Sequence, residues 1–563
     1  MIFLQLIFVM TGGLLQLVGK GSQDFLITGG NPSFTNFRTM YRKHTEFAME
    51  HFRIYFKTST HSYPTSGSLT LRTKIERYAD LIHDCYLNFT LPAIYSPVVP
   101  ITPGSVEHQN PLSEAVGYEF KWIQNIGYNM IRRVSVLING QEIATHTGEW
   151  MKLYAQLNFD ANKLAKLNKL IGNVPELYDP ANAYDRLNQY PHAINIDTSI
   201  AAPSIPAYNL VIPLHFWFCE NVGMSLPLIA IQNSEVELVV ELHNAYELFT
   251  VTDVRTTTVS ETSGQRIPPD TADSLFALNN FLSPPATIDS LRTWNFKPFV
   301  EVNYIFLGDS ERSHIAKQED QSFLITQIDM KQAMGHYGAS NDLELGMRNL
   351  CTRVVLVSQR SDISRKNDPD NYTNWISSIP PTNSAVFSSG VALPLSVSQK
   401  DIVLESVLLL DGKERFELKQ TEYFSRLQNY KYQNGNMIDG VYTYSFALNH
   451  TAFQPSGHMN GSMFNKTILR NSYIEPPLTT APDTITTTCV LKSTANSPNP
   501  VIIRDPAAVD GNGKLVYSPS DIVTIIRKSD AQTRQYNFNV RAYIESYNFL
   551  RILGGTAGLM FSS

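Results

Sequence analysis

The sequence predicts an all-β protein made of two tandem β-sandwiches with inserted loops and short helices. Three observations predict this fold class. The chain is rich in aromatic residues, with 27 Tyr and 29 Phe among 563 residues, and aromatic side chains favour strands. The 31 Pro and 30 Gly residues fit many turns and long loops. A short pattern occurs twice, half a chain apart, which suggests two similar domains.

The repeated pattern is an apolar strand followed by a tight turn. It spans residues 134–142 and 406–414, and its turns are Asn139-Gly140 and Asp411-Gly412, with the glycines 412 − 140 = 272 residues apart. Asn-Gly and Asp-Gly supply the positive φ of a type I′ hairpin, so they set the register of the strands. An aromatic helical segment follows each turn: Trp150, Leu153, Tyr154 and Leu157 in one copy, and Tyr423, Phe424 and Leu427 in the other.

Alternating apolar residues predict the strands. In residues 51–57, Phe52, Ile54 and Phe56 alternate with more polar side chains, as in a strand with one buried face. Spacing of i, i+3, i+4 and i+7 predicts one helix over residues 148–170. About eight strands in each sandwich is the jelly-roll count. Further strands are predicted at 68–75, 81–91, 130–138, 208–218, 234–242, 299–307, 322–330, 351–358, 402–410, 441–448 and 536–546.

We expect four parts along the chain. Repeated Gly and Asn-Pro breaks predict an N-terminal arm over residues 1–45. Residues 46–248 form the first jelly roll, and residues 296–563 form the second. The Thr- and Ser-rich residues 249–295, with two Pro-Pro pairs, are expected to be a linker between them.

Composition and charge exclude several classes of protein. The net charge is −6 and no Lys/Arg cluster runs along any segment, so nothing indicates a basic face for nucleic acid. Residues 1–18 carry no charge, yet they are short for a membrane span and lack the basic region and cleavage site of a signal peptide. Four widely spaced cysteines predict small buried side chains in a reducing compartment: Cys85, Cys219, Cys351 and Cys489.

No catalytic, cofactor-binding or metal-ligating residues are predicted. The chain lacks a Walker P-loop, a His-Glu-x-x-His motif and a Gly-x-Ser-x-Gly motif. Glu235 and Glu237, at i and i+2 on one strand, have a spacing that suits the paired carboxylates of a glycosidase, although solvated surface charges are commoner. The run 216–218 (Phe-Trp-Phe) suits a sugar platform or, more simply, core packing. Of five Asn-x-Ser/Thr sequons, Asn371 lies in a long polar loop and is the candidate for glycosylation.

Four stretches in the same order resemble one known family. They are residues 12–42, which include Gly12-Gly13 and Gly29-Gly30-Asn31-Pro32; residues 212–231, which include Pro213-Leu-His-Phe-Trp217; residues 446–457, which include Gln454-Pro-Ser-Gly457; and residues 547–555. On these residues the chain resembles the double jelly-roll major capsid proteins of nucleocytoplasmic large DNA viruses. Met10-Thr11-Gly12-Gly13 is similar to the usual family start, so residues 1–9 are expected to be an extension. Residues 460–465 depart from the family pattern, so no family contact is carried over to them.

The resemblance implies a structural protein that is no enzyme and needs no cofactor. Members of the family form homotrimeric, pseudo-hexagonal capsomers of an icosahedral shell. Localisation in the virion capsid after assembly in the host cytoplasm is therefore expected. The expected partners are other copies of this chain, minor capsid and penton proteins, and the inner viral membrane through the N-terminal arm, with no direct nucleic acid. Loops at 141–207, 249–295, 359–400 and 470–520 are the expected tower and trimer contacts.

Two other classes stay open at this point. One is a secreted carbohydrate-active β-sandwich protein, either an enzyme or a lectin, which would need convergent carboxylates or aromatic side chains. The other is a minor capsid or vertex protein of the same group of viruses, although such proteins usually resemble single jelly rolls.

Overall fold

The structure is a computed structural model that describes residues 12–28, 31–57, 62–96, 98–100, 115–117, 119–187, 189–193, 202–252, 266–267, 277–283, 292–363, 367–375, 400–450, 452, 454–477, 486–492, 501–503, 522–526 and 535–561. The chain forms two compact units, residues 1–47 and residues 48–563. In the first unit, the described residues include the short helices α2 (Gly12–Val18) and α3 (Asp24–Thr28). The expected extension at residues 1–9 lies outside the described residues.

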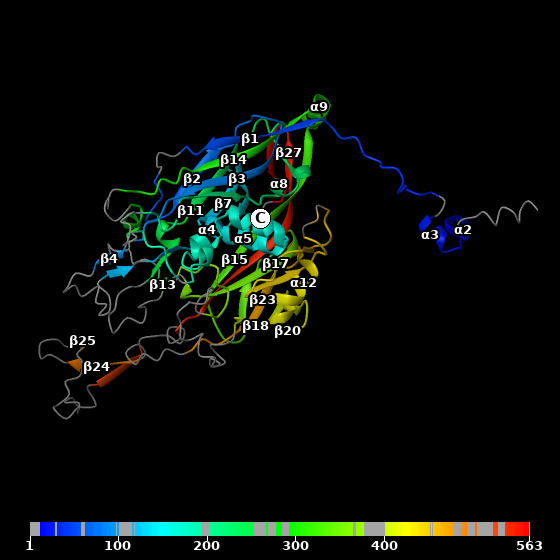
Figure 1. Ribbon diagram of the computed structural model, residues 1–563. Helices are drawn as coiled ribbons and strands as arrows, with labels where there is room; N and C mark the ends of the chain where they lie inside the picture. Colours follow the sequence, from blue (N-terminus) through cyan, green and yellow to red (C-terminus); the bar gives the residue numbers. More distant parts are fainter. Residues whose placement is uncertain are drawn as a thin grey trace, which may run out of the picture. The chain divides into compact units, whose positions relative to one another are not determined.

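The first sandwich consists of two sheets (Figure 1). Its strands are β1 (Phe47–Tyr55), β2 (Leu69–Lys74), β3 (Leu81–Leu91), β7 (Ile131–Ile138), β8 (Gln141–His146), β9 (Tyr208–Pro213), β10 (Leu226–Pro227), β11 (Val236–Leu242) and β14 (Phe299–Leu307). One sheet has the order β1-β14-β3-β10, with β9 also paired to β3, and the other has the order β2-β11-β7-β8. On β11 the apolar residues Val236, Leu238, Val240 and Leu242 are buried, and the three residues between them are half-buried, because successive side chains point to opposite faces.

The second sandwich repeats this arrangement. Its strands are β15 (Asp320–His336), β16 (Asn341–Glu344), β17 (Leu350–Arg360), β18 (Val403–Leu410), β19 (Lys413–Glu414), β20 (Lys419–Gln420), β21 (Val441–Ser445), β22 (Met459–Asn460), β23 (Thr467–Tyr473), β27 (Phe538–Leu553) and β28 (Thr556–Leu559). One sheet has the order β15-β27-β17-β21, with β22 also on β17 and β28 on β27. The other has the order β16-β23-β18-β19, with β20 also on β18.

The two sandwiches therefore share one topology. Reading β15, β27, β17 and β21 against β1, β14, β3 and β9 gives the same neighbours in the same order, and so does β16-β23-β18-β19 against β2-β11-β7-β8. Both repeated turns have the positive φ that the type I′ hairpin requires, at Asn139-Gly140 and at Asp411-Gly412. The prediction of two tandem jelly-roll sandwiches is confirmed.

A helical segment follows each repeated turn. In the first sandwich the predicted single helix is two helices, α5 (Gly148–Asn158) and α6 (Ala161–Leu170), because Phe159 is extended and Asp160 caps the second helix by accepting from the backbone N–H of Lys163. Thr147 caps α5 in the same way. In the second sandwich a π-helical turn, η8 (Tyr423–Leu427), continues into α12 (Gln428–Tyr432).

Three expectations about the chain order are wrong. The strand at 299–307 is β14, which pairs with β3 from Phe299 to Ile305, so it belongs to the first sandwich and not to the second. The predicted linker at 249–295 begins with β12 (Phe249–Thr252), which pairs with β6 (Phe120–Trp122) and packs into the first core. The predicted strand at 208–218 ends at Pro213, and a short helix, α8 (Trp217–Glu220), follows.

The remaining elements lie around these sheets. They are α4 (Ile126–Asn129), α7 (Pro175–Tyr178), η1 (Ala183–Asp185), η2 (Val222–Met224), η3 (Ala245–Glu247), η5 (Leu278–Phe281), α9 (Asp309–Lys317), η9 (Gly461–Met463), β4 (Val98–Pro100), β5 (Ala115–Gly117), β13 (Arg266–Ile267), β24 (Thr486–Lys492), β25 (Val501–Ile503) and β26 (Ile522–Ile526). Among the helices of the described part, none has the length and apolar character needed to cross a membrane.

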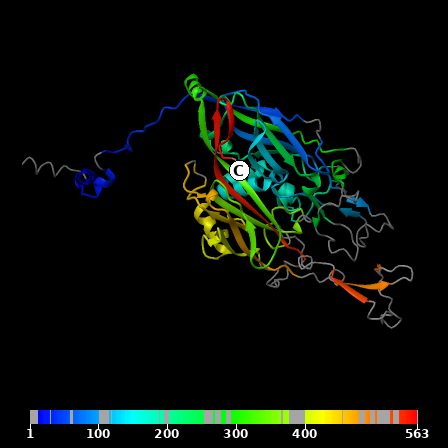
Figure 2. The same ribbon diagram turned by 180° about the vertical axis from the view of Figure 1, so that it is seen from behind.

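Each sandwich has its own core, but the C-terminal end of the chain packs into the core of the first sandwich. Buried residues of both sheets form one cluster in the first sandwich and another in the second. However, Leu550, Ile552 and Ala557, from β27 and β28, are buried in the core cluster of the first sandwich. The first half of the long strand β27, drawn in red in Figure 2, thus packs into the core of the second sandwich, and its last residues pack into the core of the first.

Candidate functional site at the junction of the sandwiches

Helix α5 of the first sandwich packs against the outer face of the large sheet of the second. Trp150, Leu153 and Leu157 on α5 form a buried cluster with side chains of β17, β21 and β27, namely Val355, Val357, Val441 and Tyr543, together with Tyr372. This contact explains why β17 is buried along nearly its whole length. One of its faces covers its own core, and α5 covers the other.

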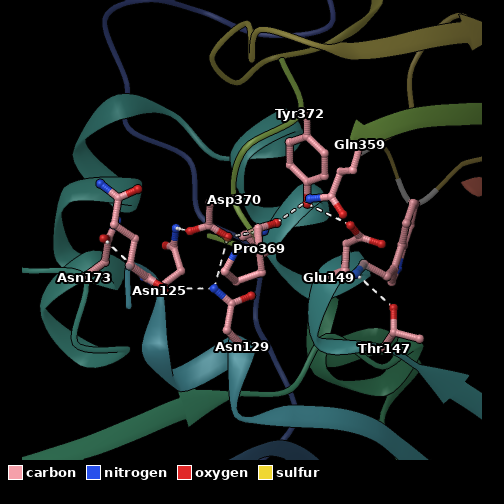
Figure 3. Close-up of polar contacts among 12 residues, drawn as sticks. Asn125, Asn129, Thr147, Glu149, Asn173, Gln359, Pro369, Asp370 and Tyr372 are labelled. Carbon is pink, nitrogen blue, oxygen red and sulfur yellow. Dashed lines mark hydrogen bonds and ion pairs between the residues drawn. The ribbon is translucent and has the colours of Figure 1, made fainter. Parts of the chain in front are cut away.

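A largely buried carboxylate on α5, that of Glu149 with 17% of its side chain exposed, binds the second sandwich directly. Arg541 of β27 donates two hydrogen bonds to Glu149, each at 2.6 Å, and the hydroxyls of Tyr543 and Tyr372 donate at 2.5 and 3.0 Å. Figure 3 shows Glu149 with Tyr372 and Gln359 around it. Burial alone would raise the pKa of Glu149, but the charge and hydrogen bonds of Arg541 outweigh it and lower this pKa to about 2. Glu149 is therefore an anion at every physiological pH.

A second buried carboxylate belongs to the second sandwich and binds residues of the first. Asp370, in the segment after β17, accepts hydrogen bonds from Lys152 of α5, from Asn125 at 2.6 Å and from Asn129 at 3.0 Å (Figure 3). The side chains of Lys152 and Asp370 are only 3% and 9% exposed. The loop of the second sandwich is thus bound to helix α4 and helix α5 of the first by charged and amide groups shielded from water.

A third polar contact lies at the end of α5. The guanidinium of Arg353, on β17, is fully buried and pairs with Glu545 on β27. It also donates to the side-chain oxygens of Asn158 of α5 at 3.0 Å and of Gln433 at 2.9 Å. The junction therefore combines an apolar cluster with three buried polar contacts along one helix.

The C-terminal hairpin adds a clasp between the sandwiches. The backbone N–H of Asn233 donates to the carbonyl of Gly555 at 2.9 Å, and its side-chain amide donates to the carbonyl of Gly554 at 3.1 Å. Both glycines have positive φ, which the tight β27–β28 turn requires. The backbone N–H of Ala557 donates to the hydroxyl of Ser234.

This arrangement is suited to holding two sandwiches in one orientation. Removing one partner of a buried ion pair costs about 3–5 kcal/mol, because the other charge stays buried and unpaired. A different docking angle would break several such contacts at once. The junction can therefore supply a rigid two-domain building block, and it offers no exposed reactive group.

The paired carboxylates noted in the sequence do not form a catalytic site. Lys74 donates to Glu235 at 2.7 Å, and this hydrogen bond lowers the pKa of Glu235, so the group is not poised as a general acid. Glu237 lies within 3.9 Å of Arg72. Glu235 lines a polar hollow of about 460 Å³ with Lys74, Glu76 and Arg77.

The other sequence candidates are structural side chains. Phe216, Trp217 and Phe218 are at most 5% exposed and belong to the first core, so they form no sugar platform. No group of three or more metal-ligating residues comes together among the residues described. Cys85 and Cys351 are buried free thiols and Cys219 is half-buried. The side chain of Cys489 lies outside the described residues.

Asn371, the candidate for glycosylation, is buried in the structure. This residue is 1% exposed, and its side-chain amide donates to the carbonyl of Trp375 at 2.8 Å. Its side-chain oxygen accepts from the backbone N–H and the hydroxyl of Thr373. The folded chain therefore hides the nitrogen that a glycan would occupy. The segment packs beside the junction, where Asp370 and Tyr372 bind α5.

Sequence reasoning missed the junction residues. Glu149 and Arg541 are 392 residues apart, and Lys152 and Asp370 are 218 apart, so no local motif joins them. The one available signal was the apolar face of residues 148–158, which also carries Glu149 and Lys152. The expected role of the 141–207 insertion in contacts between subunits does not hold for α5, which packs within the chain.

Two jelly rolls of one topology, fixed by a buried junction, define a double jelly-roll structural protein. The family model for the N-terminus of major capsid proteins matches residues 35–307, and the model for large eukaryotic DNA virus major capsid proteins matches residues 311–498. The boundary between the two models falls just after β14, in agreement with its pairing in the first sandwich.

Individual relatives agree along most of the chain. The major capsid protein of Phaeocystis pouchetii virus is 26% identical over 529 residues, which cover 82% of this chain and 92% of that protein. The major capsid protein of Paramecium bursaria Chlorella virus 1 is 25% identical over 98% of this chain and 100% of that protein. This chain belongs to the family of large eukaryotic DNA virus major capsid proteins. It is a structural protein of the virion capsid and not an enzyme.

Solved structures share the fold. The quasi-atomic model of the PBCV-1 virus capsid matches with a TM-score of 0.58 at 19% identity, covering 94% of this chain and 100% of that one. The Faustovirus major capsid protein matches with a TM-score of 0.57 at 11% identity, covering 96% of each chain.

Proposed function

We propose that this chain assembles into homotrimeric capsomers of pseudo-hexagonal outline, which tile the icosahedral shell of a large DNA virus. The observation that carries the proposal is the shared topology of two sandwiches held in one compact unit by a buried junction. Three chains bring six sandwiches of one kind around a threefold axis. Six similar domains around this axis give the trimer a nearly sixfold outline, so that it can pack in a hexagonal lattice.

The contacts between chains must then be heterologous. A ring of three closes only when one surface of each chain meets a different surface of the next, with rotation about a single axis. A rigid junction supports this closure, because a hinge between the sandwiches would let the ring open or vary in size. The boundary between the two jelly rolls is proposed to follow β14, at residues 308–319, rather than the expected residue 296.

We propose further partners for the N-terminal arm. Its exposed apolar side chains include Leu26 at 88%, Ile27 at 89% and Phe37 at 99%. Neighbouring capsomers, minor capsid and penton proteins, or the inner viral membrane would cover them. We also propose that assembly takes place in the host cytoplasm, where the free thiols would stay reduced. No direct contact with nucleic acid is proposed.

The mass of the recombinant protein in solution tests the capsomer. Light scattering after size exclusion is expected to give 3 × 63.3 = 189.9 kDa, stable on dilution. A stable mass of 63.3 kDa would contradict the proposal.

Deleting residues 10–45 tests the arm. The expected result is soluble trimers of normal mass that no longer form closed shells in the electron microscope. Normal shells from the deleted protein would remove any need for the arm in assembly.

A further inference from the structure

The two helical segments that follow the repeated turns meet very different surroundings. Helix α5 is buried between the two sandwiches, and Trp150, Leu153 and Leu157 are at most 1% exposed. The segment η8–α12 occupies the same place after the second turn, yet Leu427 and Tyr430 are 52% and 80% exposed. Figure 1 shows α12 at the margin of the second sandwich.

Three exposed side chains of η8–α12 are the counterparts of junction side chains on α5. Met151 and Ala155 of α5 enter the core of the first sandwich, and Phe424 of η8 enters the core of the second. Relative to Met151, the junction residues Trp150, Leu153, Tyr154 and Leu157 stand at −1, +2, +3 and +6. The same offsets from Phe424 give Tyr423, Arg426, Leu427 and Tyr430, of which the last three are exposed and Tyr423 is half-buried against the second core.

The other half of the contact also has a counterpart. Helix α5 packs on the outer face of the β15-β27-β17-β21 sheet, which corresponds in topology to the β1-β14-β3-β9 sheet of the first sandwich. The outer face of that sheet carries aromatic and long side chains. Arg53 lies over the ring of Phe299 at 5.1 Å, Tyr55 lies beside the same ring, and His51 lies beside Tyr86.

That outer face is partly open. Tyr55 is 68% exposed and Met49 is 42% exposed, while Phe299 and Tyr86 are half-buried. The equivalent face of the second sandwich is buried by α5. The chain therefore contains one complete contact of a helix on a sheet of the other sandwich, that of α5 on the second sandwich. Within the described part of the chain, the helix η8–α12 lacks such a sheet to pack on, and the outer face of the β1-β14-β3-β9 sheet lacks such a helix; we call these two the unmatched helix and the unmatched face.

We infer that η8–α12 of one copy packs on the β1-β14-β3-β9 face of the next copy, repeating between chains the contact that α5 makes within each chain. This inference rests on the proposed trimer and names its contact surfaces. In a ring of three chains, contacts within chains and contacts between chains would then alternate around six sandwiches. The unmatched helix and the unmatched face are the two different surfaces that a heterologous ring requires.

Both surfaces carry charged side chains beside their apolar ones. The helix presents the exposed cations Arg426 and Lys431 beside Leu427 and Tyr430. The sheet face presents Asp84, which is 28% exposed, and an ion pair of Arg53 with Glu301, whose side chains are 61% and 29% exposed. The contact between chains would be more polar than the junction within the chain, as is usual for parts that fold before they associate.

Paired variants test the inference. The helix variant carries Leu427→Asp and Tyr430→Asp, and the sheet variant carries Met49→Asp and Tyr55→Asp. All four residues are well exposed, so each variant is expected to fold with the thermal stability of the isolated wild-type chain. The control is Val222→Asp, at a residue that is 53% exposed and belongs to neither surface. Native mass spectrometry measures the assembly state.

Each variant alone is expected to lose about 100-fold or more in association and to run at 63.3 kDa, while the control stays at 189.9 kDa. Mixing the two variants restores one contact, since the sheet variant still has its helix and the helix variant still has its sheet face. The mixture is therefore expected to give a one-to-one dimer of 2 × 63.3 = 126.6 kDa and no trimer.

The outcomes separate this inference from the proposed trimer. A wild-type trimer with a helix variant that remains trimeric would overturn the inference and leave the trimer intact. Monomeric variants whose mixture yields no dimer would show that the two surfaces do not meet. A wild-type chain that is monomeric would overturn the proposed function and the inference together.

Discussion

The two jelly rolls have one strand order but differ in what their helices touch. In the first, α5 turns Trp150, Leu153 and Leu157 toward the other sandwich and adds Glu149, Lys152 and Asn158 as polar contacts. In the second, η8–α12 presents Arg426, Leu427 and Tyr430 at the surface. A duplicated domain can therefore use one geometry for a permanent junction and for a contact that forms later.

The chemistry of the two surfaces follows from this difference. A contact made during folding can bury charges such as Glu149 and Arg541, because its partners are always present. A surface that is exposed to water until another chain binds it must not cause aggregation, so it mixes apolar side chains with exposed cations. Matched variants of the two regions test this difference.

The largest effect is expected at Trp150. Replacing it with alanine removes a fully buried ring from the junction cluster, and such changes cost about 3–5 kcal/mol. The matched variant Tyr430→Ala, at an exposed ring, should change the stability of the dissociated chain by at most about 0.5 kcal/mol. Thermal unfolding at low protein concentration measures both. Equal losses from the two variants would contradict the comparison.

The buried ion pair should come next. Glu149→Gln leaves Arg541 buried with no opposite charge, so a loss of about 3 kcal/mol or more is expected in urea unfolding. Asp342→Asn breaks an Arg–Asp pair of similar geometry, 2.7 Å long, whose side chains are more than 40% exposed. That exposed pair should contribute less than about 1 kcal/mol. If the order of the two losses were reversed, the junction would not be the stronger contact.

The C-terminal hairpin should stabilise the first sandwich. Leu550→Ala would open a cavity in the first core at a cost of about 2–5 kcal/mol, although β27 belongs to a sheet of the second sandwich. Leu553→Ala, three residues on and 54% exposed, is the control. Hydrogen exchange should show faster opening of β3 and β10 in the first variant only. Faster exchange confined to the second sandwich would contradict this assignment.

Acid should weaken both sandwiches through one histidine in each. Burial lowers the pKa of His146 and of His450 to about 3, with help from the charge of His215 and of Arg353 respectively. The fold holds both rings neutral, whereas the unfolded chain binds protons below its pKa of about 6.5. Their contribution to stability is therefore full above pH 6.5 and is lost as the pH falls toward 3.

The expected slope is about 1.4 kcal/mol per pH unit for each histidine, or about 2 kcal/mol each at pH 5. Glu149 behaves differently, because its lowered pKa contributes stability that is full above about pH 4.5 and is lost as the pH falls to 2. Melting temperatures of wild type and His146→Phe from pH 7 to pH 5 measure this slope. The variant should lose less on acidification, while replacement of the exposed His458 by phenylalanine should lose as much as wild type.

Local patterns in the sequence predicted the two sandwiches well, because alternation and Asn-Gly or Asp-Gly turns act between neighbouring residues. The strands at 81–91 and 402–410 are examples. The placement of β14 in the first sandwich could not be predicted in this way, because its pairing with β3 depends on a residue more than 200 positions away. Arg541 and Asp370 could not be predicted as partners of α5 for the same reason, because they lie 392 and 218 residues from Glu149 and Lys152 along the chain.

Burial also decided what the sequence left ambiguous. Asn371 stands in a polar stretch that looks like a surface loop, yet that stretch folds onto α5 through Asp370 and Tyr372. The run from Phe216 to Phe218 suited a sugar platform as well as a core, and the structure places it in the core. Such outcomes depend on which segments cover one another, and no short pattern records that.

A cryo-electron microscopy structure of the recombinant wild-type capsomer would show the contacts within and between chains together. We predict a trimer in which Leu427 and Tyr430 of each chain lie on Tyr55, Phe299 and Tyr86 of the next, with α5 unchanged at the junction within each chain. A trimer whose η8–α12 segments face solvent, or whose sandwiches have changed their angle at the junction, would contradict it.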